Sequence, residues 1–301
     1  MRLKIIALFS FIVLAVGLAG WALSVSAATS LTQADPNDAP RALGAAVAQL
    51  EVEGLVTERW LSLRAADPAM REPFLAGTPN AKSEAATAFA NKINDASANA
   101  PELVGVRPSL VALVDANGIV LGRNGSTLMR GQDLAKAYPT LKTAIDTGTT
   151  SSDVWVNRER NEQLLASYAP VRGEDGKVLG AVVFGTSLND ERLTAASDKT
   201  SGQAILLAVK GDKGLDIVAK SANAEGAVVD ALGKPPASDA ALQVLATGKS
   251  LDISGMPSGA AGIARMLDGY GDGKRAVVVA VVKPPQKSLA SALLFPAIGA
   301  V

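Results

Sequence analysis

The sequence contains neither cysteine nor histidine among its 301 residues. The absence of cysteine excludes disulfide bonds, thiol nucleophiles and thiolate metal sites. The absence of histidine removes the commonest general base, the commonest metal ligand and the usual group that changes charge near neutral pH. Most hydrolytic and redox mechanisms are thereby excluded, and we expect neither an enzyme nor a metal site nor a bound cofactor.

Aromatic residues are scarce, and neither charge is in excess. Phenylalanine, tryptophan and tyrosine make up 4% of the residues, and 29 basic side chains balance 29 acidic ones. No basic patch stands out, which argues against nucleic acid as a partner. The glycine-rich segment GYGDGKR (269–275) lacks the spacing of a phosphate-binding loop and precedes an apolar run typical of a strand, so it indicates a hairpin turn.

The start of the chain is apolar. Residues 5–28 carry no charge and are long enough to cross a bilayer, which requires about 20 apolar residues. Arg2 and Lys4 precede this segment, so the positive-inside rule places the amino terminus in the cytoplasm and exports the rest of the chain. We expect residues 1–28 to be an uncleaved membrane anchor; the alternative is a signal peptide cleaved after V-S-A (25–27).

The end of the chain is also apolar. Residues 288–301 carry no charge and come after Lys283 and Lys287. The segment is too short to span a bilayer, and we interpret it as the start of a second membrane helix. The alternative is a short apolar helix that packs on the domain.

Two helices are predicted before the first strand. Over residues 41–64, one stripe recurs at steps of three, four or seven: Leu43, Val47, Leu50, Gly54 and Leu61. We expect this stripe to pack on its own domain; the alternative is a second copy of the helix, which would make a homodimer. A second helix over residues 81–98 would place four residues on one side: Ala85, Phe89, Ile93 and Ala96.

The remainder of the chain carries one pattern twice, and its length is sufficient for two ordinary domains. Residues 111–125 form an apolar run, a D-A-N-G turn and a second apolar run, as in a tight hairpin. A helix and three further strands come next, and residues 203–282 repeat this order. Matching glycines are 96, 100 and 97 residues apart: Gly118 and Gly214, Gly148 and Gly248, Gly176 and Gly273. We therefore expect two domains, each with a five-stranded antiparallel sheet, over residues 29–201 and 202–287.

This order of motifs resembles the double Cache sensors, a PAS-like class of extracytoplasmic domains. The resemblance extends over roughly residues 41–283. It rests on the D-x-x-G hairpin (115–118), the G-x-D-L loop (131–134) with the helix after it, and the strand that leads into A-P-V (169–171). It implies a mixed α/β (α+β) fold, in which a long N-terminal helix precedes two tandem PAS-like antiparallel-sheet modules flanked by membrane helices.

Members of this class are typically the input regions of chemoreceptors, histidine kinases and nucleotide cyclases. The resemblance therefore implies the extracytoplasmic small-molecule sensor region of a transmembrane receptor. Such a protein would lie in the cell inner membrane, with its main domain in the periplasm. The residues by themselves imply only an exported tandem domain, so the alternative is a secreted or singly anchored binding or scaffold module without signalling output.

A ligand site is predicted in the first module. Trp155 and Tyr168 fall on neighbouring predicted strands and are expected to line a cleft over the sheet. Arg123, Arg130 and Arg158 lie nearby in the sequence and would bind a small anion or carboxylate through paired donors. The alternative is that both aromatic residues belong to the core and the arginines are surface charges.

Members of the class that bind amino acids carry a tyrosine, arginine, tryptophan, tyrosine and aspartate signature around their pocket. The segment DVWVNRERN (153–161) has the tryptophan but places its arginines elsewhere, which argues against amino-acid recognition. The second module offers only Arg265, Asp268 and Tyr270 as conspicuous polar or aromatic strand residues. We expect it to be a spacer that passes a displacement to the membrane helix.

Overall fold

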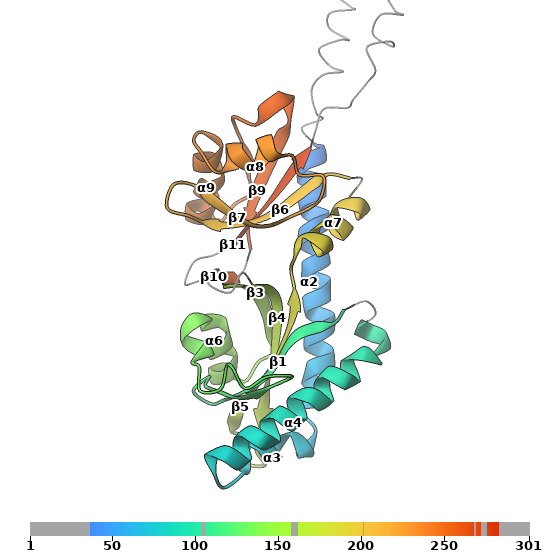
Figure 1. Ribbon diagram of the computed structural model, residues 1–301, viewed down its shortest axis with the longest axis vertical. Helices are drawn as coiled ribbons and strands as arrows, with labels where there is room; N and C mark the ends of the chain where they lie inside the picture. The colour runs from blue at the N-terminus through green and yellow to red at the C-terminus, as the bar shows by residue number, and fades with distance from the viewer. Residues whose placement is uncertain are drawn as a thin grey trace, which may run out of the picture.

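The computed structural model describes residues 37–103, 106–157, 162–200, 202–267, 269–271 and 276–282. One long helix, α2 (Asp38–Ala65), runs beside two α/β modules that are stacked along its length (Figure 1). The membrane helices expected at residues 1–28 and 288–301 lie outside the described residues. Within the described ranges, no helix combines the length and the hydropathy that a membrane crossing requires.

Helix α2 follows the predicted pattern over its 28 residues. The predicted stripe faces the modules and is buried or half-buried: Leu43, Val47, Leu50, Gly54 and Leu61. The opposite side, which we call the outer face of α2, exposes three large apolar side chains by 58%, 63% and 66%: Val52, Leu55 and Leu63. The helix therefore buries one side in its own molecule and leaves an apolar side uncovered.

The first module contains the five expected strands. They are β1 (Pro108–Asp115), β2 (Val120–Arg123), β3 (Ser151–Asn157), β4 (Glu162–Arg172) and β5 (Val178–Ser187). Their order across the sheet is β3-β4-β5-β1-β2, and all neighbours are antiparallel. The D-A-N-G turn forms as predicted, because the Asp115 carboxylate accepts hydrogen bonds from the amides of Asn117 and Ile119, each at 2.9 Å, and Gly118 adopts a φ of +83°.

Helices cover both faces of this sheet. Helices α3 (Glu72–Leu75) and α4 (Pro79–Ala98) pack with α2 on one face (Figure 1). Helices α5 (Leu134–Ala137) and α6 (Pro139–Thr147) cover the other face. Two 3-10 turns, η1 (Pro68–Arg71) and η2 (Pro101–Leu103), lie in the connections.

The buried side of α4 differs from the predicted one. The structure buries five residues, of which only Ile93 was expected: Ser83, Ala86, Ala90, Ile93 and Ser97. The predicted residues Phe89 and Ala96 are partly buried and pack against the same core, so the predicted side is confirmed in part, and the contact with β2 turns the fully buried side by about one residue. A Cβ atom on Gly122 would lie 2.7 Å from the amide nitrogen of Thr87, so only small side chains fit between this helix and β2.

The second module repeats the topology of the first. Its strands are β6 (Ala204–Lys210), β7 (Leu215–Lys220), β8 (Leu251–Ile253), β9 (Ala261–Met266) and β11 (Ala276–Val282), in the order β7-β6-β11-β9-β8. This is the order of the first sheet once each strand is matched to its counterpart. Helices α8 (Gly226–Leu232) and α9 (Ala237–Thr247) and the turn η3 (Pro257–Gly259) complete it. Helices α6 and α9 both end at a left-handed glycine, Gly148 (φ 67°) and Gly248 (φ 66°).

The segment between the modules is a helix for most of its length. The small and polar residues of 195–202 predict a linker, but α7 (Asp190–Lys199) occupies most of them and buries Leu193 and Ala196. Helix α7 is fixed to the second sheet, since the Asp190 carboxylate accepts a hydrogen bond from the Lys220 amide at 2.9 Å. The expected division at residue 201 falls between α7 and β6, and the independence of the two domains stays a prediction.

A short strand links the modules directly. Strand β10 (Gly269–Gly271) lies between β9 and β11 in the sequence but pairs with β3 in the first module. The pairing is parallel, with Tyr270 opposite Trp155. The first sheet therefore has six strands instead of the five expected, and part of the segment GYGDGKR, interpreted above as a hairpin turn, is a strand.

An apolar core also joins the modules, and we call it the junction core. It combines α2 residues such as Leu43 and Val47 with Val154 and Leu165 of the first sheet and Leu207 of the second. The two modules and α2 thus share one interior.

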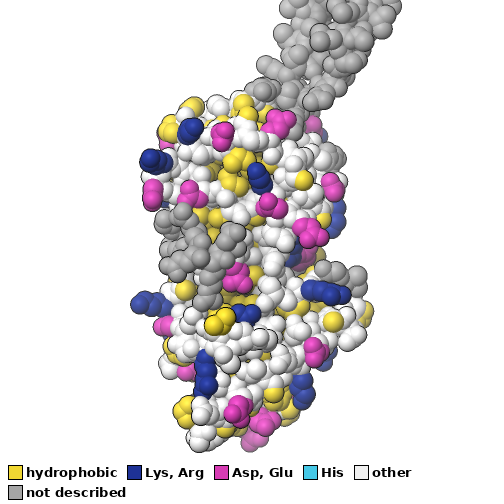
Figure 2. Space-filling view, viewed as in Figure 1, with side chains coloured by type: hydrophobic (Ala, Val, Ile, Leu, Met, Phe, Trp, Pro, Cys, Tyr) yellow, Lys and Arg dark blue, Asp and Glu magenta, His cyan; other side chains and the backbone are white. Residues whose placement is uncertain are grey.

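Basic and acidic side chains are interspersed over both modules on the face that Figure 2 shows.

Candidate functional site

Three aromatic rings are buried between the first sheet and α6, and we call them the aromatic cluster: Tyr138, Trp155 and Tyr168. Their exposed fractions are 7%, 2% and 0% in that order. The rings of Tyr138 and Trp155 are stacked with centroids 3.8 Å apart and planes inclined by 3°, and the Tyr168 ring lies 6.3 Å from Trp155. Trp155 and Tyr168 therefore lie close together as expected, but both are packed in the core of the module instead of lining an open cleft.

Local structure explains how these side chains meet. Trp155 lies on β3 opposite Leu164, and Tyr168 lies on β4 opposite Ser151, so both project from the same face of the sheet. Tyr138 precedes Pro139, which disfavours helical backbone at the residue before it. The tyrosine accordingly has an extended backbone (φ −129°, ψ 86°) between α5 and α6, and this break directs its ring toward β3.

Two donors in the aromatic cluster are unsatisfied. Trp155 Nε1 and the Tyr168 hydroxyl are buried and form no hydrogen bond with any described residue. The Tyr168 hydroxyl lies close to the side chains of Thr140, Ser151 and Asp153, but none of them makes a well-directed hydrogen bond with it. An unsatisfied buried donor costs about 1–3 kcal/mol.

The electrostatic surroundings keep Tyr168 neutral. Burial is the main cause that raises the pKa of its hydroxyl, and the nearby Asp153 carboxylate raises that pKa further. Asp153 itself is only 3% exposed and accepts a hydrogen bond from the Thr140 hydroxyl of α6. Tyr168 therefore retains its proton and can act as a hydrogen-bond donor over the physiological pH range.

The predicted arginines are not gathered at the aromatic cluster. Arg130 donates hydrogen bonds to the Pro79 carbonyl (3.2 Å) and to Asn80 Oδ1 (2.9 Å), at the start of α4. Arg123 donates to two backbone carbonyls, those of Asn124 (3.2 Å) and Ser109 (3.3 Å). In the described part of the chain neither side chain forms a hydrogen bond with Trp155 or Tyr168, because each is held by other partners, which for Arg123 include the sulfur atom of Met129. Arg158 lies outside the described residues.

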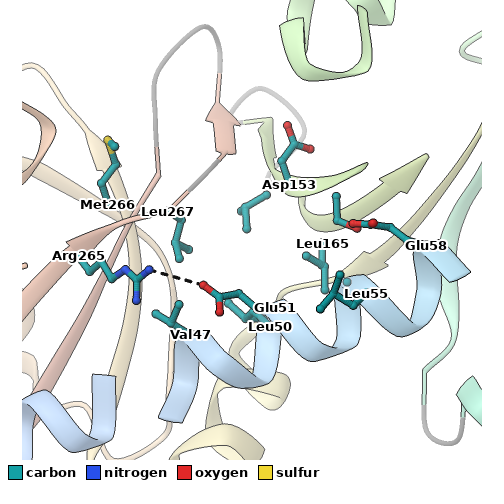
Figure 3. Close-up of a pocket in the computed structure, with 13 residues that line it drawn as sticks. Val47, Leu50, Glu51, Leu55, Glu58, Asp153, Leu165, Arg265, Met266 and Leu267 are labelled. Atoms are coloured by element: carbon teal, nitrogen blue, oxygen red, sulfur yellow. Dashed lines mark ion pairs between the residues drawn. The ribbon is translucent and has the colours of Figure 1, made fainter. Parts of the chain in front are cut away.

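A second region, which we call the junction pocket, lies where α2 meets both modules (Figure 3). Its volume is 330 Å³. One wall is α2, from Val47 to Glu58; the second comes from β3 and β4, and the third from Arg265 to Leu267. The guanidinium of Arg265 lies 3.6 Å from the carboxylate of Glu51 at the rim.

The sequence gives little sign of the junction pocket. Its walls come from three segments separated by about one hundred residues each, and every residue in them fits an ordinary helix or strand pattern. Gly54 is the one local signal, because a Cβ atom there would lie 3.1 Å from Ser152 Cβ, so a glycine allows α2 to approach β3. Arg265 was conspicuous in the sequence, and the structure places it here. Asp268 lies outside the described residues, and only the backbone of Tyr270 is described.

The described residues offer no metal site, since no group of three or more acidic side chains within them is arranged to hold a cation.

The family model for the double sensory domain of two-component sensor kinases matches residues 44–251 of this chain. No curated protein matches the sequence.

Solved structures share the fold at low sequence identity. A domain of a sensory box/GGDEF family protein from Vibrio parahaemolyticus is 11% identical and superposes with a TM-score of 0.50 over 82% of this chain and 96% of that chain. The extracellular domain of the histidine kinase vpHK1S-Z8 is 9% identical, with a TM-score of 0.50 over 82% and 93%. The sensor domain of Vibrio cholerae DctB is 14% identical, with a TM-score of 0.46 over 89% and 99%. Because the family model spans most of the chain, this protein belongs to the double Cache sensory domains of the dCache_3 family.

Proposed function

We propose that this protein senses a small molecule outside the cytoplasm by binding it at the aromatic cluster of the first module. The observation that carries the proposal is the pair of buried donors, Trp155 Nε1 and the Tyr168 hydroxyl, neither of which makes a well-directed hydrogen bond with a described residue. A ligand oxygen that accepts from both donors would remove a desolvation cost of about 1–3 kcal/mol for each. Membership of a family of sensory domains supports this role.

The proposed ligand has an acceptor oxygen, as in a carboxylate or a carbonyl, next to a flat or apolar portion. The acceptor would face Trp155 and Tyr168, and the apolar portion would take the place of Tyr138, whose ring now lies 3.8 Å from that of Trp155. Arg158 follows β3 by one residue and remains the proposed partner of an anionic group. Arg123 and Arg130 are not part of this site.

Ligand entry would require α5 and α6 to move away from β3, because Tyr138 lies between these helices. We propose that the movement reaches the second module through β3 and its parallel partner β10. Strand β10 leads into β11, which ends at Val282, shortly before the second predicted membrane helix.

We further propose that the anchored chain lies in the inner membrane with residues 29–287 in the periplasm. A periplasm-active reporter fused after Lys287 tests that topology, and activity of only a cytoplasm-active reporter there would contradict it.

We also propose that the receptor is a homodimer through the outer face of α2. Val52, Leu55 and Leu63 expose most of their surface and succeed one another at steps of three and eight residues along one side of the helix. A second copy of α2 would cover this apolar strip, and two parallel helices would bring both predicted membrane anchors to the same side.

The ligand proposal is tested with the chain in which Trp155 is the single tryptophan, made by Trp21→Phe and Trp60→Phe. A ligand that binds the folded form raises the melting temperature, so a small-molecule panel can be screened by thermal shift. Binding at the aromatic cluster should also change Trp155 emission, since it separates Tyr138 from the indole. A stabilising ligand that leaves the emission of Trp155 unchanged and binds the Tyr168→Phe chain equally well would contradict the site.

A further inference from the structure

We infer that the junction pocket is a second small-molecule site, and that it takes an organic cation with an apolar body. The pocket is separate from the aromatic cluster, which lies on the opposite face of β3. Successive residues of a strand point to opposite faces, so Ser152 and Val154 face α2 while Asp153 and Trp155 face α6. The two sites therefore lie on opposite faces of β3, and Asp153 contributes to both.

The size and shape of the junction pocket suit a small ligand. Its volume of 330 Å³ falls at the lower end of the range of about 300–1,000 Å³ that is usual for ligand pockets. Leu50, Val154, Leu165 and Leu267 contribute apolar surface from three different parts of the chain. A ligand bound there would contact α2, the first module and the second module at once.

The charges around the pocket favour a cation. Glu51 and Glu58 both line it from α2, and Arg265 is the one basic side chain among the lining residues. Arg265 is paired with Glu51 at 3.6 Å, so its charge is offset. Glu58 is half-buried and forms no ion pair with any described residue, which leaves one negative charge in excess.

The carboxylate of Asp153 adds no further negative charge to the pocket. It contributes to the lining, but its carboxylate points away from the cavity (Figure 3) and accepts a hydrogen bond from Thr140 on the opposite face of β3. An ammonium group beside Glu58, with its hydrocarbon portion against Leu165 and Val154, would match both the charge and the apolar lining of the pocket.

The test uses the full chain in nanodiscs of zwitterionic lipid and three probes of similar shape: 2-phenylethylammonium, neutral 2-phenylethanol and anionic 3-phenylpropionate. Isothermal titration should show saturable binding of the ammonium probe at one site per chain. The alcohol and the carboxylate should bind at least ten-fold more weakly. Absence of saturable ammonium binding, or equal affinity for the carboxylate, would overturn the inference.

Variants locate the probe. Glu58→Gln removes the charge with little change in shape and should weaken ammonium binding about ten- to hundred-fold. The matched control, Glu72→Gln on the exposed surface of α3, should leave the affinity unchanged. Trp155→Phe should also leave it unchanged. Loss of binding in Trp155→Phe but not in Glu58→Gln would assign the probe to the aromatic cluster and overturn the junction site.

A chemical measurement locates the probe even if Glu58→Gln alters the fold. Carbodiimide activation joins an amine to a nearby carboxylate as an amide, and mass spectrometry identifies the modified residue. The ammonium probe should label Glu58 in preference to exposed acidic residues such as Glu72. Labelling that follows exposure alone would overturn the site.

Discussion

The guanidinium of Arg192 on α7 forms an ion pair with the carboxylate of Glu53 on α2, across 139 residues of sequence. Both side chains are mostly buried, with exposed fractions of 20% and 23%. Arg192 also donates hydrogen bonds to the Thr186 hydroxyl (2.7 Å) and the Ser187 carbonyl (3.1 Å) at the end of β5. One side chain therefore holds the helix between the modules against both α2 and the first sheet.

Replacement of Arg192 by methionine should lower the free energy of unfolding by about 2 kcal/mol, because it leaves the Glu53 carboxylate buried without its charged partner. Urea unfolding measures the loss. Arg41→Met is the control: Arg41 pairs with Asp38 on the surface, with exposed fractions of 72% and 41%, and its loss should change the stability by less than about 0.5 kcal/mol. Equal losses in the two variants would show that the Arg192 pair contributes no more than a surface contact.

Tyr168→Phe should separate ligand binding from folding. The variant keeps the ring and removes a hydroxyl that has no hydrogen-bond partner among the described residues, so the apo protein should be as stable as the parent or more stable. Affinity for a ligand found by thermal shift should fall about ten-fold, equivalent to about 1.4 kcal/mol.

Arg130→Ala serves as the comparison for Tyr168→Phe. Because Arg130 bonds with Pro79 and Asn80 on the surface, its removal should change neither the ligand affinity nor the stability by more than about 0.5 kcal/mol. Loss of ligand binding in Arg130→Ala, with unchanged binding in Tyr168→Phe, would move the site to the start of α4.

Two glycine-to-alanine variants should have opposite effects. At Gly122 a Cβ atom would meet the backbone of α4, 2.7 Å from the Thr87 nitrogen and 2.9 Å from the Ser83 oxygen, so Gly122→Ala should cost about 1–3 kcal/mol. At Gly44 no atom lies within 4 Å, so Gly44→Ala should stabilise α2 by about 0.5–1 kcal/mol. Thermal unfolding of both variants checks the signs, and a stabilised Gly122→Ala would contradict the close packing of α4 on β2.

Strand β10 should protect the outer edge of β3. Three prolines in place of residues 269–271 cannot donate to a sheet ladder, so this variant should lose the pairing with residues 154–156. Hydrogen exchange should become faster at the β3 amides while the β5 amides, which lie inside the sheet, stay protected. Unchanged exchange along β3 would show that β10 does not hold this edge in solution.

The outer face of α2 should determine the oligomeric state. Leu55→Asp places a charge in the middle of the proposed interface, on a residue that is 63% exposed in one copy, so it should dissociate a dimer without unfolding the chain. Light scattering of the full chain checks the mass. The control, Leu75→Asp, changes a residue of similar exposure (66%) on α3 and should leave the mass unchanged.

Much of the fold is predictable because its signals are local. The D-A-N-G turn and the apolar runs on either side of it fix the β1–β2 hairpin within a few residues, and Gly148 and Gly248 end their helices as expected. The rotation of α4 was predicted only in part, since its alanines and serines give little contrast between faces and its partner at Gly122 lies far along the chain.

The same distinction applies to the candidate site. Trp155 and Tyr168 could be placed together because adjacent antiparallel strands fix which residues meet. Arg130 could not be placed, because the course of a loop depends on contacts with distant segments, here the start of α4. Strand β10 has only three residues, two of them glycine, so no periodic pattern marks it.

Strand β10 makes the two halves of this duplicated protein dependent on each other. A first half that ended after α7 would lack the neighbour of β3 and would offer free backbone N–H and C=O groups along that edge. Such an edge recruits other chains, so the excised half would tend to aggregate. Because the second half supplies β10 to the first sheet, deletion of the second half would also remove the cover of β3, and the remaining half would need a new neighbour for that edge.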